Sequence, residues 1–359
     1  MPSSNETFPN GNGDGRPPGR RPTMREVAAV AGVSLATVSR ALNGDPKVAP
    51  ELAVRVNDAV AMLGYRRDLT ATNLRRADRA SASVGLVFDD IANPFHATLH
   101  RAIEDVARER GVLAFAGSSD EDAERERELV QAFCSRRVDG LVIVPAGRDH
   151  SYLLRDREAG VAMVFVDRPP GFIDADVVLS DHAGGARTGT AHLIAAGHRR
   201  IGYLGDRRAI HSATERLRGH TEALAAAGVA YDPELVRMEL EDSAMAARAT
   251  AELLALDEPP TAIFAAQNLI TIGAVTALRE QRRRHDVALV GFDDVPLADA
   301  LDPGLTVIAQ DAVALGRTAA ERLFARLDGD TGPTQTVLLP TTLIARGSGE
   351  IPPPPGGAR

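Results

Sequence analysis

The feature that most constrains the fold of this 359-residue chain is an alternation, from Val84 onward, between short apolar runs and amphipathic helical stretches. Such alternation predicts parallel β-sheets with helices on both faces. The apolar runs form two series that meet near Asp181, so the body is expected to fold as two α/β lobes of about 100 residues each. The predicted strands are 84–88, 111–116, 140–144 and 162–166 in the first series, and 201–204, 261–264 and 287–290 in the second.

Ahead of this alternation, residue types that favour helix ends predict three short helices. Thr23 and Glu26 form a capping box, so the first helix begins there. Ser34 caps a second helix that runs to about Asn43, and Pro50 opens the third as its first residue. The N-terminal part of the chain is therefore expected to be all-α.

The first two helices are joined by a turn that contains Gly32, which is typical of a helix-turn-helix whose second helix enters the major groove of DNA. Apolar residues at helical spacing would form the small core of this head: Val27, Ala31, Val33, Val38 and Leu42. The other face of the second helix carries small or polar side chains that fit a groove: Leu35, Ala36, Thr37, Ser39 and Arg40.

Charge is divided unevenly between the two parts. Residues 1–80 contain 12 Lys and Arg against 8 Asp and Glu, whereas residues 81–359 contain 29 against 41. The net charge of −8 therefore combines a basic head with an acidic body. A basic head suits a polyanion such as DNA.

Several other functions are disfavoured. The single cysteine, Cys134, allows no intramolecular disulfide, and its place beside Phe133 indicates a core position. No apolar run is long enough to span a membrane, and the first residues lack the pattern of a signal peptide. HExxH spacing, phosphate-binding glycine motifs and a nucleophile–base pair are not found, so no catalytic residue, metal site or cofactor is predicted. We expect a cytoplasmic, nucleoid-associated protein that is not an enzyme.

The segment 23–43 closely resembles the N-terminus of the LacI/GalR (lactose-repressor) family of bacterial transcription regulators, most specifically in the runs 31–34 (Ala-Gly-Val-Ser) and 37–40 (Thr-Val-Ser-Arg). Further motifs extend the resemblance over nearly the whole ordered chain: 93–95, 167–168, 180–181, 197–202, 216–219, 291–294 and 339–348. The resemblance implies a helix-turn-helix head on a bilobal body similar to a periplasmic sugar-binding protein, with parallel sheets.

The same resemblance assigns DNA contacts to the head. Base edges would be read by the first residues of the second helix, namely Leu35, Ala36 and Arg40, of which Arg40 can donate two hydrogen bonds to guanine. Phosphates would be bound by hydroxyl and amide side chains, which fix the register on DNA: Thr23, Ser34, Thr37, Ser39 and Asn43. The alternative is that Ser34 only caps the helix and Thr37 only covers its surface.

A hinge is expected after the third helix. In the family, two copies of this segment pair in the minor groove, where a leucine wedges between base pairs and bends the duplex. The resemblance gives these roles to Ala71 and Leu74. Arg67, Asp68 and Thr72 depart from the residues usual in the family, so a plain solvated linker remains the alternative.

Polar residues follow several predicted strands, at the edge where parallel sheets bind ligands. They are Asp89, Asn93, Asp167, Gln267 and Asp293, with Arg216 near the start of a helix. Carboxylates that accept hydrogen bonds and a guanidinium that donates them suit vicinal hydroxyl groups.

The family resemblance adds Phe95 and His96 and implies that these and the other named residues except Asp89 bind a sugar-like effector between the lobes. Asp89 joins the eight predicted effector-binding residues through its strand-end position. His96 and Gln267 differ from the residues frequent at those positions. The alternatives are that strand-end Asp residues only cap helices and that Arg216 pairs with Glu215 or Glu222.

These observations predict a homodimeric, sequence-specific regulator, most plausibly a repressor, that binds a palindromic operator under the control of a small sugar-like effector. An activator, or a regulator controlled by a protein partner, is the main alternative; a sugar-binding module without DNA function is a distant one. The expected divisions are a disordered tail (1–22), the helix-turn-helix domain (23–65), the hinge (66–82), the bilobal domain (83–346) and a second disordered tail (347–359). Within the body, the first lobe is expected at about 83–180 plus 309–335 and the second at about 181–308 plus 336–346.

Overall fold

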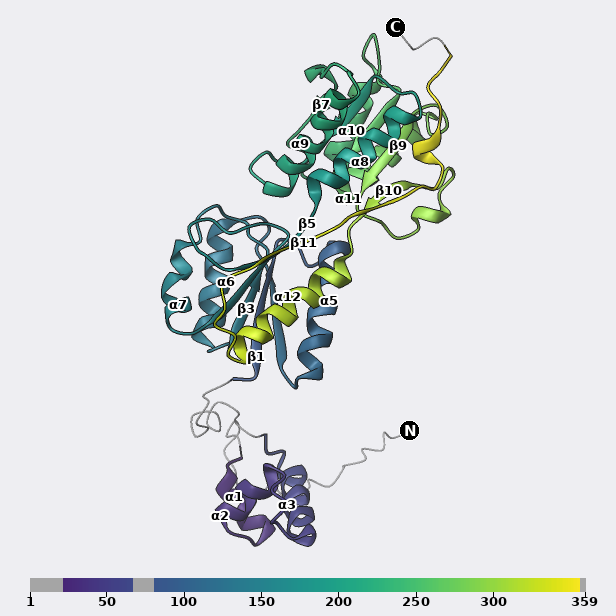
Figure 1. Ribbon diagram of the computed structural model, residues 1–359. Helices are drawn as coiled ribbons and strands as arrows, with labels where there is room; N and C mark the ends of the chain where they lie inside the picture. Colours follow the sequence, from purple (N-terminus) through teal and green to yellow (C-terminus); the bar gives the residue numbers. More distant parts are fainter. Residues whose placement is uncertain (1–21, 67–80, 356–359) are drawn as a thin grey trace, which may run out of the picture. The chain divides into compact units, whose positions relative to one another are not determined.

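The computed structural model describes residues 22–66 and 81–355, which belong to two compact units divided at residue 79 (Figure 1). The predicted hinge residues Ala71 and Leu74 lie outside these ranges, as does all but the last residue of the predicted tail 1–22. No helix within the described ranges combines the length and the apolar character that a membrane span requires.

The head consists of the three predicted helices: α1 (Met24–Ala31), α2 (Leu35–Leu42) and α3 (Pro50–Leu63). The capping box is present, because the Thr23 amide donates to Glu26 Oε2 at 2.6 Å and the Glu26 amide donates to Thr23 Oγ1 at 3.4 Å. Ser34 caps α2, and Pro50 stands in the first turn of α3, as predicted. These local signals therefore set the helix boundaries.

One side chain of α3 also closes the end of α1. Val27, Val38 and Val56 are fully buried at the centre of the head, with Val33 and Leu42 packed around them. Arg55 of α3 donates to the carbonyl oxygen of Ala31 at 2.6 Å. It thus supplies a partner to a carbonyl group at the end of α1, where the helix itself provides none.

In the body, six parallel strands form the first sheet in the order β11-β5-β4-β3-β1-β2. They are β1 (Ser83–Phe88), β2 (Leu113–Ser118), β3 (Gly140–Ile143), β4 (Ala162–Val166), β5 (Asp176–Ser180) and β11 (Thr336–Leu339). On one face, Leu86 packs with α5 (Pro94–Glu109) and α12 (Ala312–Leu327); on the other, Val87 packs with α6 (Ala123–Ser135). Burial on both faces explains why the strands read as continuous apolar runs.

The α6 side of this sheet also includes η1 (Ser151–Leu153), which continues into α7 (Leu154–Glu158). Cys134 on α6 is half-buried against this core, which agrees with its predicted core position, and burial raises the pKa of its thiol to about 12.

The second sheet has the order β12-β10-β9-β8-β6-β7, and only its edge strand β12 is antiparallel to its neighbour. The strands are β6 (Ile201–Leu204), β7 (Val236–Arg237), β8 (Ala262–Ala265), β9 (Ala288–Phe292), β10 (Thr306–Ala309) and β12 (Thr342–Ile344). Helices α8 (His182–Ala195) and α9 (His211–Ala226) cover one face, and α10 (Ser243–Leu254) and α11 (Asn268–Glu280) cover the other. Short helical turns complete the lobe: η2 (Pro233–Leu235), η3 (Ala298–Ala300) and η4 (Ser348–Glu350).

All seven predicted strands are present, with some ends shifted along the chain. The largest shift is at β2, which begins at Leu113 rather than at Gly111 because Gly111 takes a left-handed turn (φ 69°) after α5. The α/β bilobal prediction is confirmed. Strands β5, β7, β10, β11 and β12 were not predicted.

The chain passes between the lobes three times: after β5, after β10 and after β11 (Figure 1). The last passage corrects the expected division at residue 336, because β11 still pairs with β5 in the first sheet. Pro340 follows β11 directly and has no N–H to extend the ladder, which marks where the chain leaves that sheet.

The expected C-terminal tail 347–359 is wrong for its first residues. Ser348 in η4 is buried, its hydroxyl donates to the Leu289 carbonyl at 2.6 Å, and it accepts from the Thr306 amide at 2.9 Å. The carbonyl of Ile351 lies 2.8 Å from His198 Nε2. The second lobe therefore extends at least to Ile351; the proline-rich composition concealed these tertiary contacts.

Candidate functional site

The predicted DNA-reading residues lie on the accessible surface of α2. Leu35 is 43% exposed, and Ala36 and Arg40 are also exposed, whereas Val38 points into the head core. The helix therefore presents these side chains to the surroundings while the core holds it in place, as a recognition helix requires.

The predicted phosphate-binding residues flank this surface and also serve the helices themselves. The hydroxyl of Ser34 accepts from the Thr37 amide at 3.1 Å and contacts Thr37 Oγ1 at 2.8 Å. Thr23 belongs to the capping box of α1. Ser39 is partly exposed on α2, and Asn43 is the C-cap residue of α2. The capping interpretation of Ser34 is correct, and since its side chain remains exposed, capping leaves it accessible to a phosphate.

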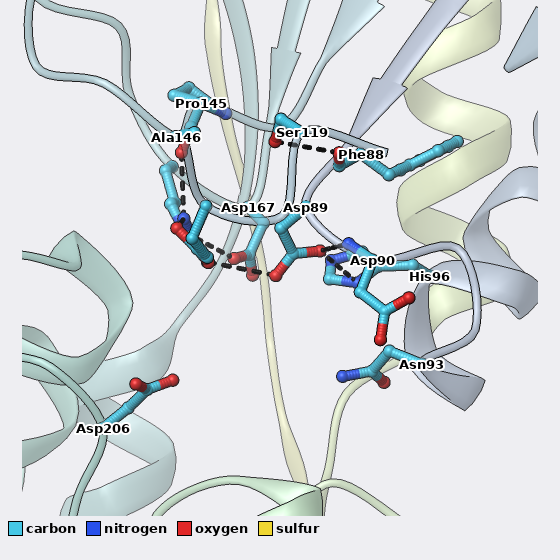
Figure 2. Close-up of polar contacts among 12 residues, drawn as sticks. Phe88, Asp89, Asp90, Asn93, His96, Ser119, Pro145, Ala146, Asp167 and Asp206 are labelled. Carbon is cyan, nitrogen blue, oxygen red and sulfur yellow. Dashed lines mark hydrogen bonds and ion pairs between the residues drawn. The ribbon is translucent and has the colours of Figure 1, made fainter. Parts of the chain in front are cut away.

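In the body, all eight predicted effector-binding residues line one cavity between the lobes, which contains about 360 Å³ of unfilled space, part of it open to solvent. They are Asp89, Asn93, Phe95, His96, Asp167, Arg216, Gln267 and Asp293. The carboxyl ends of strands from both sheets meet at this cavity, as expected for parallel sheets. Figure 2 shows Asp89, Asn93, His96 and Asp167 gathered there, with Asp206 facing them from the second lobe.

Four further residues line the same cavity and were not predicted: Arg168, Asp206, Ser212 and Gln310. Asp206 and Gln310 follow β6 and β10, so the strand-end rule applies to them as well. Gln310 was missed because β10 itself was not recognised. Arg168 adjoins Asp167 in a motif that already indicated the site.

Asp89 and His96 form a buried ion pair at the first-lobe wall of the cavity, with 2.6 Å between Asp89 Oδ1 and His96 Nδ1. Burial acts to raise the pKa of Asp89, but the charges of His96 and Arg168 outweigh it and lower this pKa to about 2. Burial likewise acts to lower the pKa of His96, and the neighbouring Asp89 carboxylate raises it above its usual value. The two side chains therefore hold each other in place and form a charged part of the cavity surface.

Arg168 connects three carboxylates of the first lobe. It donates to both oxygens of Glu121, at 2.6 and 2.8 Å, and to the Pro145 carbonyl at 2.9 Å. Its guanidinium also lies 3.5 Å from carboxylate oxygens of Asp89 and of Asp167. One cation thus compensates much of the negative charge at this wall.

Arg216 is buried on the second-lobe side and is not engaged with Glu215 or Glu222, which instead bind the exposed Arg218. Its guanidinium donates to the Ala266 carbonyl at 2.8 Å and stacks over the Phe292 ring, 4.1 Å from the centroid. The alternative of a surface ion pair for Arg216 is therefore wrong.

None of the three strand-end aspartates caps a described helix, so that alternative is wrong, but two other residues of the eight do cap helices. Asn93 Oδ1 accepts from the Phe95 amide at 3.0 Å at the start of α5, and Gln267 Oε1 accepts from the Ile270 amide at 3.0 Å at the start of α11. Asn268 Nδ2 also donates to Asn93 Oδ1 at 2.7 Å, which links the two lobes directly. Asp293 has a different partner, since its Oδ1 accepts from Gln310 Nε2 at 2.6 Å.

The cavity retains buried polar atoms that have no hydrogen-bond partner among the described residues. Gln310 Oε1 is an acceptor of this kind, and His96 Nε2 is a second such atom. Unpaired buried polar atoms are costly, so such a set indicates a site for a polar ligand. Within the described ranges, no cluster of His, Cys, Asp and Glu side chains has a geometry that could hold a metal ion.

Two protein-family models match this chain, one in the head and one in the body. A family model for bacterial regulatory proteins of the lacI family matches residues 23–68, and a model for a periplasmic binding protein-like domain matches residues 190–349. The HTH-type transcriptional regulator CelR of Thermobifida fusca is 36% identical over 341 residues, which cover 92% of this chain and 99% of CelR.

Two solved structures of transcription regulators are similar to this chain over most of its length. A CelR–cellobiose complex is 33% identical with a TM-score of 0.67 and covers 91% of this chain and 100% of its own. A lac repressor dimer bound to operator and the anti-inducer ONPF is 26% identical with a TM-score of 0.80, over 92% of this chain and 99% of that one.

Proposed function

This chain belongs to the lacI family of bacterial regulatory proteins, so it is a helix-turn-helix transcription regulator and not an enzyme, and we propose that a neutral sugar held between its lobes controls its binding to DNA. The single observation that carries this proposal is the polar cavity, in which all eight predicted residues meet. Carboxylates accept hydrogen bonds from hydroxyl groups and Arg216 donates them, so vicinal hydroxyls satisfy both.

The unpaired polar atoms of the cavity support the same ligand class. A sugar hydroxyl both donates and accepts, so it can bond to Gln310 Oε1 and also reach His96 Nε2. A sugar ring also presents C–H groups, which suit the ring of Phe95 at the cavity wall. That the CelR relative was solved as a cellobiose complex favours a sugar over other polyhydroxyl compounds.

On the DNA side, we assign base reading to Leu35, Ala36 and Arg40 of α2. Thr23, Ser34, Thr37, Ser39 and Asn43 bind phosphates. Ala71 and Leu74, outside the described residues, act in the minor groove. The protein is proposed to work in the cytoplasm as a homodimer on a palindromic operator, by analogy with the lac repressor relative, which was solved as an operator-bound dimer.

Control by the sugar is a population shift. A ligand changes the lobe arrangement only to the extent that it binds one arrangement more tightly than the other. The Asn93–Asn268 hydrogen bond and the cavity residues belong to both lobes, so a sugar that contacts both walls favours the closed arrangement. The same coupling makes DNA and sugar affect each other's affinity to an equal extent.

The first test is a thermal-shift screen with cellobiose, glucose, galactose and ribose, followed by operator binding with and without each sugar that raises the melting temperature. Arg216→Met is expected to weaken sugar binding by about tenfold to a hundredfold, since it removes a charged hydrogen-bond donor, while operator affinity stays unchanged.

Arg218→Met is the matched control, because Arg218 lies on the same helix but is exposed and bound to Glu215 and Glu222. It is expected to behave like the wild type. If no sugar raises the melting temperature, or if both variants lose the response equally, the proposed cleft function is wrong. Release of DNA by the sugar would identify an inducer, and tighter binding a corepressor or an activating ligand.

A further inference from the structure

His182 is a buried histidine at the point where the chain first passes between the lobes. It is the first residue of α8, two positions after the end of β5. It is nearly inaccessible to solvent and lies behind the residues that line the cavity. Neither the sequence motifs nor the family comparison assigned it a role.

The ring joins a cavity residue of each lobe. Its Nδ1 lies 3.3 Å from both Nε and Nη2 of Arg216 in the second lobe. Its Nε2 lies 3.3 Å from the carbonyl oxygen of Asp167 and 3.2 Å from Asp167 Oδ1 in the first lobe. The ring also contacts Phe292, the aromatic residue under Arg216.

The chemistry of the partners fixes the direction of these hydrogen bonds. A guanidinium has only donors, so Nδ1 of His182 must accept from Arg216. The ring proton is therefore on Nε2, which donates to Asp167. Two hydrogen bonds therefore run in series: Arg216 donates to His182, and His182 donates to Asp167.

We propose that His182 is a positioning residue for the sugar site. It fixes the positions of Arg216 and Asp167 relative to each other across the two lobes, without touching the ligand. This proposal rests on the proposed function, since it deepens the account of the same cleft. A neutral ring between two ligand-binding side chains sets the orientation of both, in the way that outer partners orient metal ligands.

The test uses the full-length protein and cellobiose as the probe. His182→Phe preserves the ring and its contact with Phe292 but removes both hydrogen bonds, so cellobiose affinity measured by calorimetry is expected to fall about tenfold to a hundredfold. His182→Gln offers a donor and an acceptor again, and is expected to recover part of the loss, which a purely structural role would not predict.

The matched control is His220→Phe. His220 is a buried histidine of α9 that bonds to Thr190 Oγ1 at 2.9 Å and stacks beside Tyr203, away from the cavity. This variant is expected to change stability but not cellobiose affinity. Equal loss in His182→Phe and His220→Phe, or no loss in His182→Phe, overturns the proposal.

A second measurement needs no ligand. Long-range ¹H–¹⁵N NMR of histidine-labelled protein, assigned with His182→Gln, is expected to show the Nε2–H tautomer for His182, and the Nδ1–H tautomer contradicts the two hydrogen bonds in series. A wild type that does not bind cellobiose would contradict that choice of sugar, and the tautomer would still decide the role of His182.

Discussion

Asp89, Asp167 and Asp293 line the same cavity but are held by different partners. Asp89 is paired with His96, Asp167 lies between Arg168 and His182, and Asp293 accepts from the Gln310 amide. Burial acts to raise the pKa of Asp167, but the hydrogen bond from His182 and the charges of Arg168 and Arg216 outweigh it and hold that pKa well below its usual value. The Asp89 and Asp167 carboxylates therefore remain acceptors for hydroxyl groups throughout the physiological pH range.

Arg40 provides the clearest test of the DNA-reading surface. Arg40→Ala removes the only long donor among the three proposed base-reading side chains, so discrimination at one base pair is expected to fall by about 1–3 kcal/mol. A binding selection with randomised operators measures this directly. Arg248→Ala, an exposed arginine on α10 of the body, is the charge-matched control, and an unchanged base preference in Arg40→Ala would remove Arg40 from the base-reading role.

His220 predicts a pH dependence of stability. Its burial lowers its pKa to about 4, whereas in the unfolded chain it is near 6.5. Between these values the unfolded chain binds the proton and the folded chain does not, so each pH unit below about 6.5 reduces the free energy of unfolding by about 1.4 kcal/mol.

Urea unfolding of the wild type and of His220→Phe at pH 7, 6 and 5 measures this contribution. The wild type is expected to lose more stability than the variant as the pH falls, while histidines common to both proteins cancel. If the two unfolding free energies fall in parallel, folding does not lower the pKa of His220.

Most of the residues that line the cleft could be predicted from the sequence, because the carboxyl ends of parallel strands must meet at one edge of a sheet. Asp89, Asp167 and Asp293 could be placed by that rule without knowing any distance. The roles of His182 and Arg168 could not, because they depend on which side chains converge from the two lobes and on the order in which the sheet is built.

At the level of elements, short edge strands and the C-terminal turn were the least predictable parts. Strands β7 and β12 contain two and three residues, too few for a periodicity to be recognised. The η4 turn lies between glycines and prolines, whose composition is typical of a tail. In both cases, pairing with a distant segment supplies the stability that the local sequence lacks.

Ser348 shows how much that pairing contributes. Ser348→Ala would leave the buried Thr306 amide without its partner and remove the hydrogen bond to Leu289, so the free energy of unfolding of the body is expected to fall by about 1–3 kcal/mol. Chemical denaturation monitored for the body measures it. Ser151→Ala, at an exposed position, is expected to have little effect, and an equally small effect of Ser348→Ala would mean that η4 does not support the second lobe.

At the level of the whole molecule, the first sheet ends at an edge strand with exposed apolar side chains. Leu113 is 60% and Phe115 is 43% exposed on β2, which pairs with no strand on its outer side within residues 22–66 and 81–355. An unpaired apolar edge of this kind is typical of an interface between chains. We therefore expect β2 to lie at the interface of the homodimer proposed above.

Phe115→Lys is expected to shift the protein from dimer to monomer, because a charge at an edge strand opposes association. Light scattering after size-exclusion chromatography measures the mass. Phe172→Lys is the control, since Phe172 is 79% exposed in the same lobe but lies on a loop. A dimer that survives Phe115→Lys, or dissociates only in Phe172→Lys, places the interface elsewhere.

The three passages between the lobes have a consequence for synthesis on the ribosome. The head is complete once α3 has emerged, but the first sheet waits for β11 and the second for β12, close to the end of the described chain. Neither sheet can be completed until almost the whole body has been translated, so both lobes form late. A prematurely terminated product would carry a finished DNA-binding head and an unfinished sensor, and its head could not be controlled by a sugar.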